Sequence, residues 1–224
     1  MKFLERVVKG AINNGADVIN VPDTVGAKDP IKMKDFYEKV IDWVYKTNPE
    51  VVISAHNHND MGNAVANTIA LIYAAESYAI KHNARIKVQV ETTICGLGER
   101  AGNADIFPFM LWAETTTPEF ESDVSWQFNR EMSKSTANYV FKMANYVEDK
   151  NGLYVPRQSP VVGYSVNKHG SGIHTDAIEK GGHELYTIGN PMDYGHNENA
   201  KYIPGIYQGK AGKKAIDERR NSIQ

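Results

Sequence analysis

The chain has 224 residues, of which 42% are hydrophobic and 23% are charged, a composition typical of a globular protein with a sizeable core. Its 25 lysines and arginines nearly balance its 27 acidic residues, so we expect binding neither to nucleic acid nor to an anionic membrane surface. The single cysteine excludes an internal disulfide framework, and no apolar segment reaches the roughly 20 residues that span a bilayer. The N-terminus has no uninterrupted signal-peptide core. These features predict a cytoplasmic protein that acts on small molecules.

Helices and strands alternate through the first half of the chain. The apolar spacing predicts helices over residues 3–15, 33–47 and 62–83, and strands within residues 17–26, 50–60 and 84–96. Such alternation predicts an α/β fold in which helical crossovers join parallel strands. Polar residues end each strand and no glycine-rich dinucleotide fingerprint follows one, which favours a TIM barrel over a doubly wound sheet. A closed barrel needs eight strands, of which this pattern supplies three.

The character of the sequence changes near residues 113–123, a polar, threonine-rich stretch that predicts a linker or a domain edge. Beyond it, residues 126–147 have helical apolar spacing, and the rest is rich in glycine and asparagine. We therefore expect an α/β domain over residues 1–117 and a mainly helical linker or lid subdomain over residues 118–224.

Two histidines lie at the end of the second predicted strand. His56 and His58 alternate along it, so both side chains point to one face with Cα atoms roughly 6–7 Å apart. Two imidazoles and an oxygen donor suit Zn, Mn or Fe, and Mg if more oxygens join. The alternative is that both histidines are only hydrogen-bonded at a strand end. Asn59 and Asp60 are candidates to cap the next helix.

The segment GLGERAGNAD, residues 96–105, follows the third strand and contains three glycines. Glycines there allow the backbone to approach a ligand or a metal closely. The alternative is a tight loop in which Glu99 and Arg100 are solvated and Asn103 caps the following helix.

Two further motifs lie in the second half. NKHGSGIHTDAI, residues 167–178, places His169 and His174 around a Gly-Ser-Gly turn, where an imidazole can move a proton near pH 7, although a structural role is the alternative. GKAGKKAI, residues 209–216, suits either a phosphate or an exposed basic turn.

These motifs together resemble the 2-isopropylmalate synthase family and its relatives, the homocitrate and citramalate synthases. DTVG, HNHNDMGNAVAN, GLGERAGN, SGIHTDAI and AGKKAI occur in the order found in that family and cover nearly the whole chain. The GERAGN element separates the sequence from the hydroxymethylglutaryl-CoA lyases, which resemble it around the two histidines.

The resemblance implies a fold and an activity. The fold is a partial TIM (β/α)8 barrel, its last three strands, followed by the mainly helical subdomain. The activity is that of an acyltransferase, which adds the methyl carbon of acetyl-CoA to the keto carbon of a 2-oxo acid. The first choice of 2-oxo acid is 2-oxoisovalerate, as in leucine biosynthesis. The alternatives are a homocitrate synthase-like enzyme or subunit that uses 2-oxoglutarate, and a non-catalytic fragment that acts as a binding partner.

The resemblance also implies roles for six residues at matching motif positions. Three would bind a divalent cation (Mg, Mn or Zn), one would bind the substrate carboxylate, and two would be catalytic. In that order they are His56, His58 and Asn103, then Thr24, then His174 and Tyr202.

Part of the family pattern has no counterpart in this sequence. The first barrel strand of the family carries an Asp metal ligand and an Arg that steadies developing negative charge, and a glutamate follows in mid-barrel. Without them we expect little or no activity from this chain alone. A homo-oligomer or a partner polypeptide that completes the barrel is therefore expected.

Overall fold

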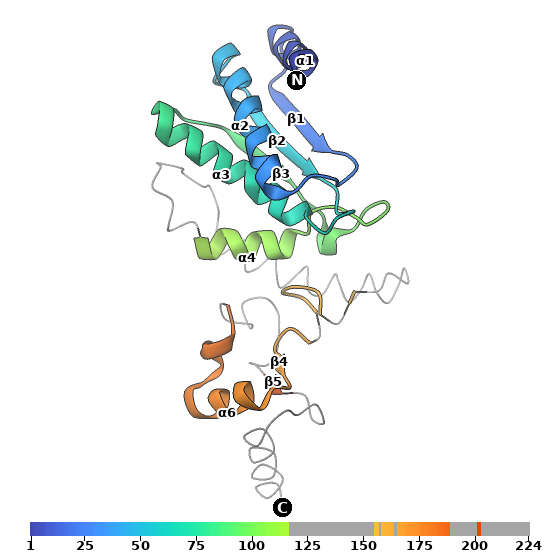
Figure 1. The fold of residues 1–224 in the computed structure, drawn as a ribbon, viewed down its shortest axis with the longest axis vertical. Helices are drawn as coiled ribbons and strands as arrows, with labels where there is room; N and C mark the ends of the chain where they lie inside the picture. The colour runs from blue at the N-terminus through green and yellow to red at the C-terminus, as the bar shows by residue number, and fades with distance from the viewer. Residues whose placement is uncertain (117–154, 157, 164, 189–200, 203–224) are drawn as a thin grey trace, which may run out of the picture. The chain divides into compact units, whose positions relative to one another are not determined.

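The computed structural model describes residues 1–116, 155–156, 158–163, 165–188 and 201–202 (Figure 1). The chain divides into two compact units, Met1–Phe128 and Asn129–Gln224. The predicted helix over residues 126–147 and the basic segment 209–216 lie outside the described residues. The predicted domain boundary after residue 117 falls where the description of the first unit stops, so it stays a prediction.

A parallel three-stranded sheet forms the centre of the first unit. Its elements in chain order are α1 (Lys2–Asn13), β1 (Val18–Asp23), α2 (Pro30–Thr47), β2 (Val52–Asn57), α3 (Ala64–His82) and β3 (Val88–Glu91). The strands pair in the order β1-β2-β3, and both pairs are parallel. The predicted alternation of helices and strands is therefore confirmed.

The helix ends follow local capping chemistry. Helix α2 begins three residues before the predicted start, because the side chain of Asp29 accepts a hydrogen bond of 3.0 Å from the backbone N–H of Lys32 and Pro30 suits the first helical position. Helix α3 ends at His82, and the next residue, Asn83, caps it in the left-handed conformation with φ of 48°.

Strand β3 is shorter than predicted, and a helix that was not predicted follows it. After Glu91 the chain forms a 3-10 turn, η1 (Ile94–Gly96), and then helix α4 (Ile106–Thr116). Residues 113–116, the start of the segment predicted as a linker or a domain edge, are the last turn of α4. Asp105 begins this helix by accepting a hydrogen bond of 3.1 Å from the backbone N–H of Phe107, so the alternative in which Asn103 is the cap is wrong.

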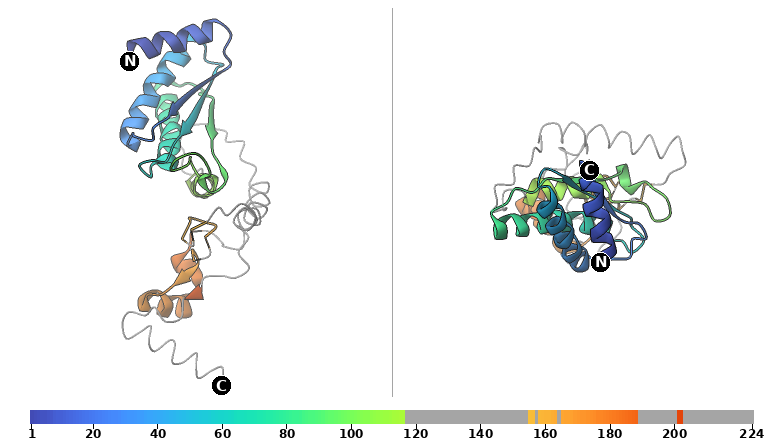
Figure 2. Two further views of the ribbon diagram at one scale, coloured as in Figure 1. Left: turned by 90° about the vertical axis from the view of Figure 1, so that its right-hand side faces the viewer. Right: turned by 90° about the horizontal axis from the view of Figure 1, so that it is seen from above.

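Helices α2 and α3 lie side by side over one face of the sheet, and α1 packs beside α2 (Figures 1 and 2). Burial along β1 alternates strictly, with Ile19 and Val21 buried towards the helices and Asn20 and Pro22 exposed on the other face. The largest fully buried apolar side chains of the core are those of Met33, Tyr37, Val40, Ile41, Val44, Ile53 and Leu71.

The described residues of the second unit are few. Strand β4 (Lys168–His169) pairs in parallel with β5 (Lys201–Tyr202), and helix α6 (Gly172–Gly181) and the 3-10 turn η3 (His183–Tyr186) follow β4. In neither unit does the described part contain a helix long and apolar enough to cross a membrane.

Candidate active site

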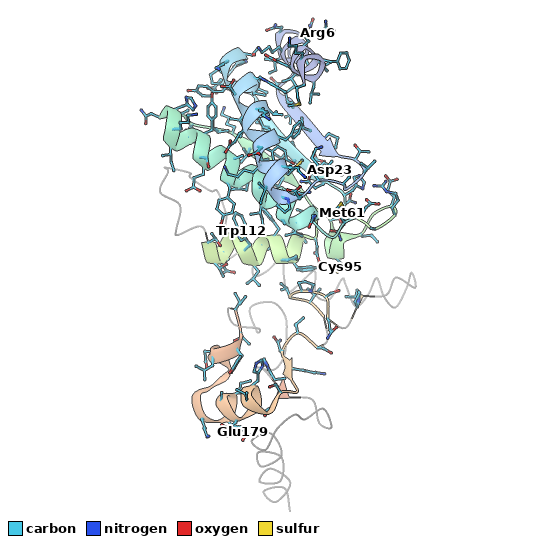
Figure 3. The ribbon with its side chains drawn as sticks, in the orientation of Figure 1. Arg6, Asp23, Met61, Cys95, Trp112 and Glu179 are labelled. Atoms are coloured by element: carbon cyan, nitrogen blue, oxygen red, sulfur yellow. The ribbon has the colours of Figure 1, made fainter. Side chains whose placement is uncertain are left out.

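The carboxyl ends of the three parallel strands meet at one edge of the sheet. Asp23 ends β1, Met61 lies in the loop after β2 and Cys95 follows β3, and all three lie towards this edge, whereas Arg6 of α1 lies at the opposite end (Figure 3). The predicted clustering of polar strand ends is therefore confirmed within the first unit.

The imidazoles of His56 and His58 face each other across this edge. Their Nε2 atoms are 3.3 Å apart, and the ring planes are inclined at 74°. His58 is buried, and His56 is partly exposed. Two nitrogens that each lie about 2.0–2.1 Å from one tetrahedral metal ion are roughly 3.3 Å apart. The two imidazoles therefore converge as two ligands of one cation do.

A loop that folds back onto the end of β2 brings Asn103 to the histidines. The backbone N–H of Ala104 donates to the carbonyl oxygen of Asn57 at 3.1 Å, and that of Asn59 donates to the carbonyl oxygen of Gly102 at 3.0 Å. Between these two hydrogen bonds, Asn103 pairs with His58 as an isolated antiparallel bridge. The chain just after β2 is thus paired with residues about 45 positions further along the sequence.

The two polar atoms of the Asn103 side chain differ in their hydrogen bonding. Its Nδ2 donates to the carbonyl oxygen of Leu97 at 3.2 Å, whereas its Oδ1 is buried without a hydrogen-bond partner among the described residues. An oxygen left in this state costs free energy unless a ligand satisfies it. The same holds for Nδ1 of His58 within the described part of the chain.

The donor set around this edge fits a divalent cation with positions left open. The candidate donors are two imidazoles and one amide oxygen, none of which carries a negative charge. Across the described residues, no group of three or more His, Cys, Asp or Glu side chains is placed to hold a metal ion. The described residues therefore supply a partial site that lacks an anionic ligand.

Glu91, at the end of β3, is a member of this cluster that the sequence analysis missed. Its Oε2 lies 3.0 Å from Nδ1 of His56, while its Oε1 accepts hydrogen bonds from Ser54 Oγ at 3.0 Å and from Asn20 Nδ2 at 2.5 Å. The parallel register places Glu91 directly opposite His56. The available signal was its position at the end of a strand next to the histidine strand.

Arg100 and Asp60 hold the loops around the site together. The guanidinium donates two hydrogen bonds to the carboxylate of Asp60, each of 3.0 Å, and a third of 2.7 Å to the carbonyl oxygen of Thr24. The hydrogen bond from Arg100 holds the pKa of Asp60 below its usual range. The alternative in which Arg100 is merely solvated is therefore wrong, and Thr24 itself is exposed at the same edge.

The capping prediction for the loop after β2 is half correct. The side-chain oxygen of Asn59 accepts a hydrogen bond of 3.1 Å from the backbone N–H of Ala64 at the start of α3. Asp60 instead pairs with Arg100. The loop after β1 comes so close that a Cβ on Gly26, whose φ is +58°, would lie 2.7 Å from the backbone nitrogen of Asp60.

In the second unit the structure brings together two histidines and a tyrosine. Nδ1 of His169 lies 3.3 Å from Nδ1 of His174, and the ring of His174 stacks on Tyr186 with centroids 4.0 Å apart. Burial, and secondarily the neighbouring His174, lowers the pKa of His169. The backbone of Tyr202 pairs with that of His169 in the β4–β5 ladder.

Comparison with known proteins gives a consistent picture. The HMGL-like family model matches residues 1–139. The 2-isopropylmalate synthase of Staphylococcus epidermidis is 36% identical over 99% of this chain and 38% of its own length. The probable 2-isopropylmalate synthase of Methanopyrus kandleri is 34% identical over 96% of this chain and 37% of its own, and the Acetivibrio thermocellus enzyme is 33% identical over 98% and 38%.

This chain therefore spans less than two fifths of the length of these relatives. A solved HMG-CoA lyase from Acenitobacter baumannii, in complex with coenzyme A and 3-methylmalate, is 18% identical with a TM-score of 0.39, over 62% of this chain and 42% of that one. Because the family model covers well over half of the 224 residues, the chain belongs to the HMGL-like family.

Proposed function

We propose that this chain contributes part of the active site of an acyltransferase that condenses acetyl-CoA with a 2-oxo acid. The similarity to 2-isopropylmalate synthases over nearly the whole chain supports this activity and favours 2-oxoisovalerate as the 2-oxo acid. The structural observation that carries the proposal is the pair of Nε2 atoms of His56 and His58, which lie 3.3 Å apart. Asn103, whose Oδ1 is buried without a partner among the described residues, pairs with His58 through its backbone.

His56, His58 and Asn103 would hold the divalent cation, which we propose to be Mg, Mn or Zn. When bound there, a divalent cation polarises the keto carbonyl of the 2-oxo acid and makes its carbon more electrophilic. Because imidazole and amide groups are neutral, these three ligands would leave the charge of the cation undiminished.

Thr24, His174 and Tyr202 would act on the two substrates. The hydroxyl of Thr24 would bind the carboxylate of the 2-oxo acid, and Arg100 fixes the backbone of Thr24 at its carbonyl oxygen. His174 would move a proton near the thioester, assisted by Tyr202. The reaction removes a proton from the methyl carbon of acetyl-CoA and forms a bond from that carbon to the keto carbon. Hydrolysis of the thioester then releases the thiol of CoA.

We further propose that residues 1–117 are the last three strands of a TIM barrel and residues 118–224 its lid subdomain. The remaining strands would come from another polypeptide. The absence of an anionic metal ligand among the described residues supports a site that needs such a contribution. The chain alone is therefore expected to have little or no turnover.

Thiol release from acetyl-CoA tests this function directly. The purified chain is assayed with Mn²⁺ or Mg²⁺ and a panel of 2-oxo acids, first alone and then with a polypeptide that carries the N-terminal barrel strands of a 2-isopropylmalate synthase. Release only after that addition, and fastest with 2-oxoisovalerate, is the expected result. Fastest release with 2-oxoglutarate would indicate a homocitrate synthase-like enzyme instead.

The non-catalytic alternative is favoured by the same incomplete ligand set. If no 2-oxo acid causes thiol release although the two polypeptides form a stable complex, the chain is a binding partner and not part of a synthase.

Two substitutions test the roles of individual histidines. Replacing His56 by Ala should abolish Mn²⁺ binding in calorimetry, whereas His82→Ala, on the outer helix α3, should leave it intact. Replacing His174 should leave Mn²⁺ affinity unchanged and lower turnover of the assembled enzyme. Unchanged Mn²⁺ affinity in the first case, or unchanged turnover in the second, removes that histidine from the proposal.

A further inference from the structure

Glu91 lies where its carboxylate can decide which nitrogen of His56 carries the proton. Its Oε2 is 3.0 Å from Nδ1 of His56, and the other ring nitrogen, Nε2, is the one that faces His58. A carboxylate only accepts hydrogen bonds, so the imidazole must donate its N–H from Nδ1. The lone pair of a neutral imidazole then lies on Nε2, which is the nitrogen available for a metal ion.

The orientation of Glu91 is itself held by two donors from the other two strands of the sheet. Ser54 Oγ and Asn20 Nδ2 both donate to Oε1, at 3.0 and 2.5 Å, so Oε2 is left to His56. The three strands of the sheet therefore meet at this one carboxylate. Together these contacts fix the orientation of the Glu91 carboxylate, with Oε2 at His56 and Oε1 at Ser54 and Asn20.

We propose that Glu91 is a positioning residue that fixes the tautomer of His56 with its proton on Nδ1 and thereby prepares Nε2 for the cation. The inference rests on the metal site of the proposed function. It assigns Glu91 no contact with the cation, because its two oxygens already have three partners. Carboxylates that accept from a ligating histidine raise the affinity for the metal by about 10- to 100-fold.

The substitutions Glu91→Gln and Glu91→Ala separate this role from simple packing. In Glu91→Gln, Asn20 and Ser54 still donate to one side-chain oxygen, so the new NH₂ group points at Nδ1 of His56. That nitrogen must then accept, and the proton moves to Nε2, the nitrogen that should bind metal. Glutamine retains the shape of glutamate, so a packing role predicts that Gln is the milder change. The tautomer role predicts that Gln is the more harmful one.

The experiment measures the tautomer and the metal affinity separately on the full chain. Nitrogen-15 NMR of the metal-free chain at pH 8 should report the proton of His56 on Nδ1 in the wild type and on Nε2 in Glu91→Gln. Mn²⁺ calorimetry should give affinities in the order wild type, Glu91→Ala, Glu91→Gln, with a loss of about 10- to 100-fold across the series. Glu50→Gln is the matched control, because the carboxylate of Glu50 pairs with Lys87 and not with a histidine of the site. It should change neither result.

The outcomes distinguish this inference from the proposed function. An unchanged His56 tautomer in Glu91→Gln overturns the inference, and so does an affinity for Mn²⁺ that is lower in Glu91→Ala than in Glu91→Gln. If the wild-type chain binds no Mn²⁺, the proposed metal site fails, but the NMR result still decides whether Glu91 sets the tautomer of His56.

Discussion

The guanidinium of Arg100 and the carboxylate of Asp60 are joined by two parallel hydrogen bonds of 3.0 Å each, across 40 positions of the chain. The same guanidinium donates to the carbonyl oxygen of Thr24, so one side chain connects the loops that follow β1, β2 and β3. These loops carry the proposed metal and substrate ligands. Their relative positions therefore depend on Arg100.

Replacing Arg100 by Lys should loosen these loops without unfolding the chain. Lysine keeps the charge but lacks the planar fork that matches a carboxylate, and exposed ion pairs contribute little to global stability. Hydrogen–deuterium exchange should become faster in residues 24–28 and 58–62, while the thermal midpoint changes little. Arg6→Lys, on α1 at the other end of the sheet, is the control and should leave exchange in both loops unchanged. Equal exchange in Arg100→Lys and wild type would contradict the connecting role.

Adding one methyl group at Gly98 should weaken metal binding. A Cβ at this position would lie 2.0 Å from Nδ2 and 2.9 Å from Cγ of Asn103, so the Asn103 side chain must move. If Asn103 is a ligand as proposed, Gly98→Ala should lower Mn²⁺ affinity in calorimetry by displacing its Oδ1. Gly10→Ala in α1 is the matched control, because a Cβ there meets nothing within 4 Å, and it should leave the affinity unaltered. Full affinity in Gly98→Ala would argue against Asn103 as a ligand.

Replacing Tyr37 by Phe should destabilise the first unit. The Tyr37 hydroxyl and the Asn57 amide form two hydrogen bonds, of 3.2 and 3.3 Å, and Asn57 also donates to Thr68 at 3.1 Å. Asn57 is 1% exposed and lies on β2 between the two site histidines, so its amide would lose a partner where water cannot replace it. We expect the free energy of unfolding to fall by about 1–3 kcal/mol in urea denaturation.

The half-buried Tyr45 of the same helix offers a comparison for this change. Tyr45→Phe should cost less than Tyr37→Phe, because its ring is nearer to solvent. Equal stability of Tyr37→Phe and wild type would show that the Asn57 amide does not depend on the hydroxyl.

Cys95 should react slowly with alkylating reagents in the folded chain. Burial, and secondarily the charge of Asp105, raises the pKa of its thiol from 9.0 to about 11. The folded state therefore holds this proton more tightly, and at pH 8 its thiolate fraction should be about 100-fold lower than in the unfolded chain. The stability that this proton contributes is present below pH 9 and is lost as the pH rises towards 11.

Because Cys95 is the only cysteine of the chain, labelling by iodoacetamide reports on it alone. The rate should rise about tenfold per pH unit up to the raised pKa, and 8 M urea at pH 8 should remove the protection. Equal rates in the folded and the urea-unfolded chain at pH 8 would contradict the raised pKa.

Local patterns determined the helices and strands of the first unit. The helical spacing of apolar residues and the alternation of strand residues depend on backbone geometry over a few positions, so both can be read from the sequence. For the same reason His56 and His58 could be assigned to one face of a strand before any contact was known. The largest difference from the prediction follows β3, where the strand ends early and the unpredicted helix α4 forms, and there the loop pairs with distant residues.

Contacts between distant residues were decided only by the tertiary structure. Glu91 meets His56 because β2 and β3 pair in one particular register, and a shift by one residue would turn Glu91 to the other face. Asn103 reaches His58 because residues 96–105 fold back onto β2, and Arg100 finds Asp60 through the same fold. Local sequence pattern thus places the two histidines on one face of a strand, whereas strand register and loop closure decide which groups surround them. The physical reason is that the spacing of residues within one helix or strand fixes the direction in which a side chain points. Pairing between elements then determines which groups lie next to that side chain.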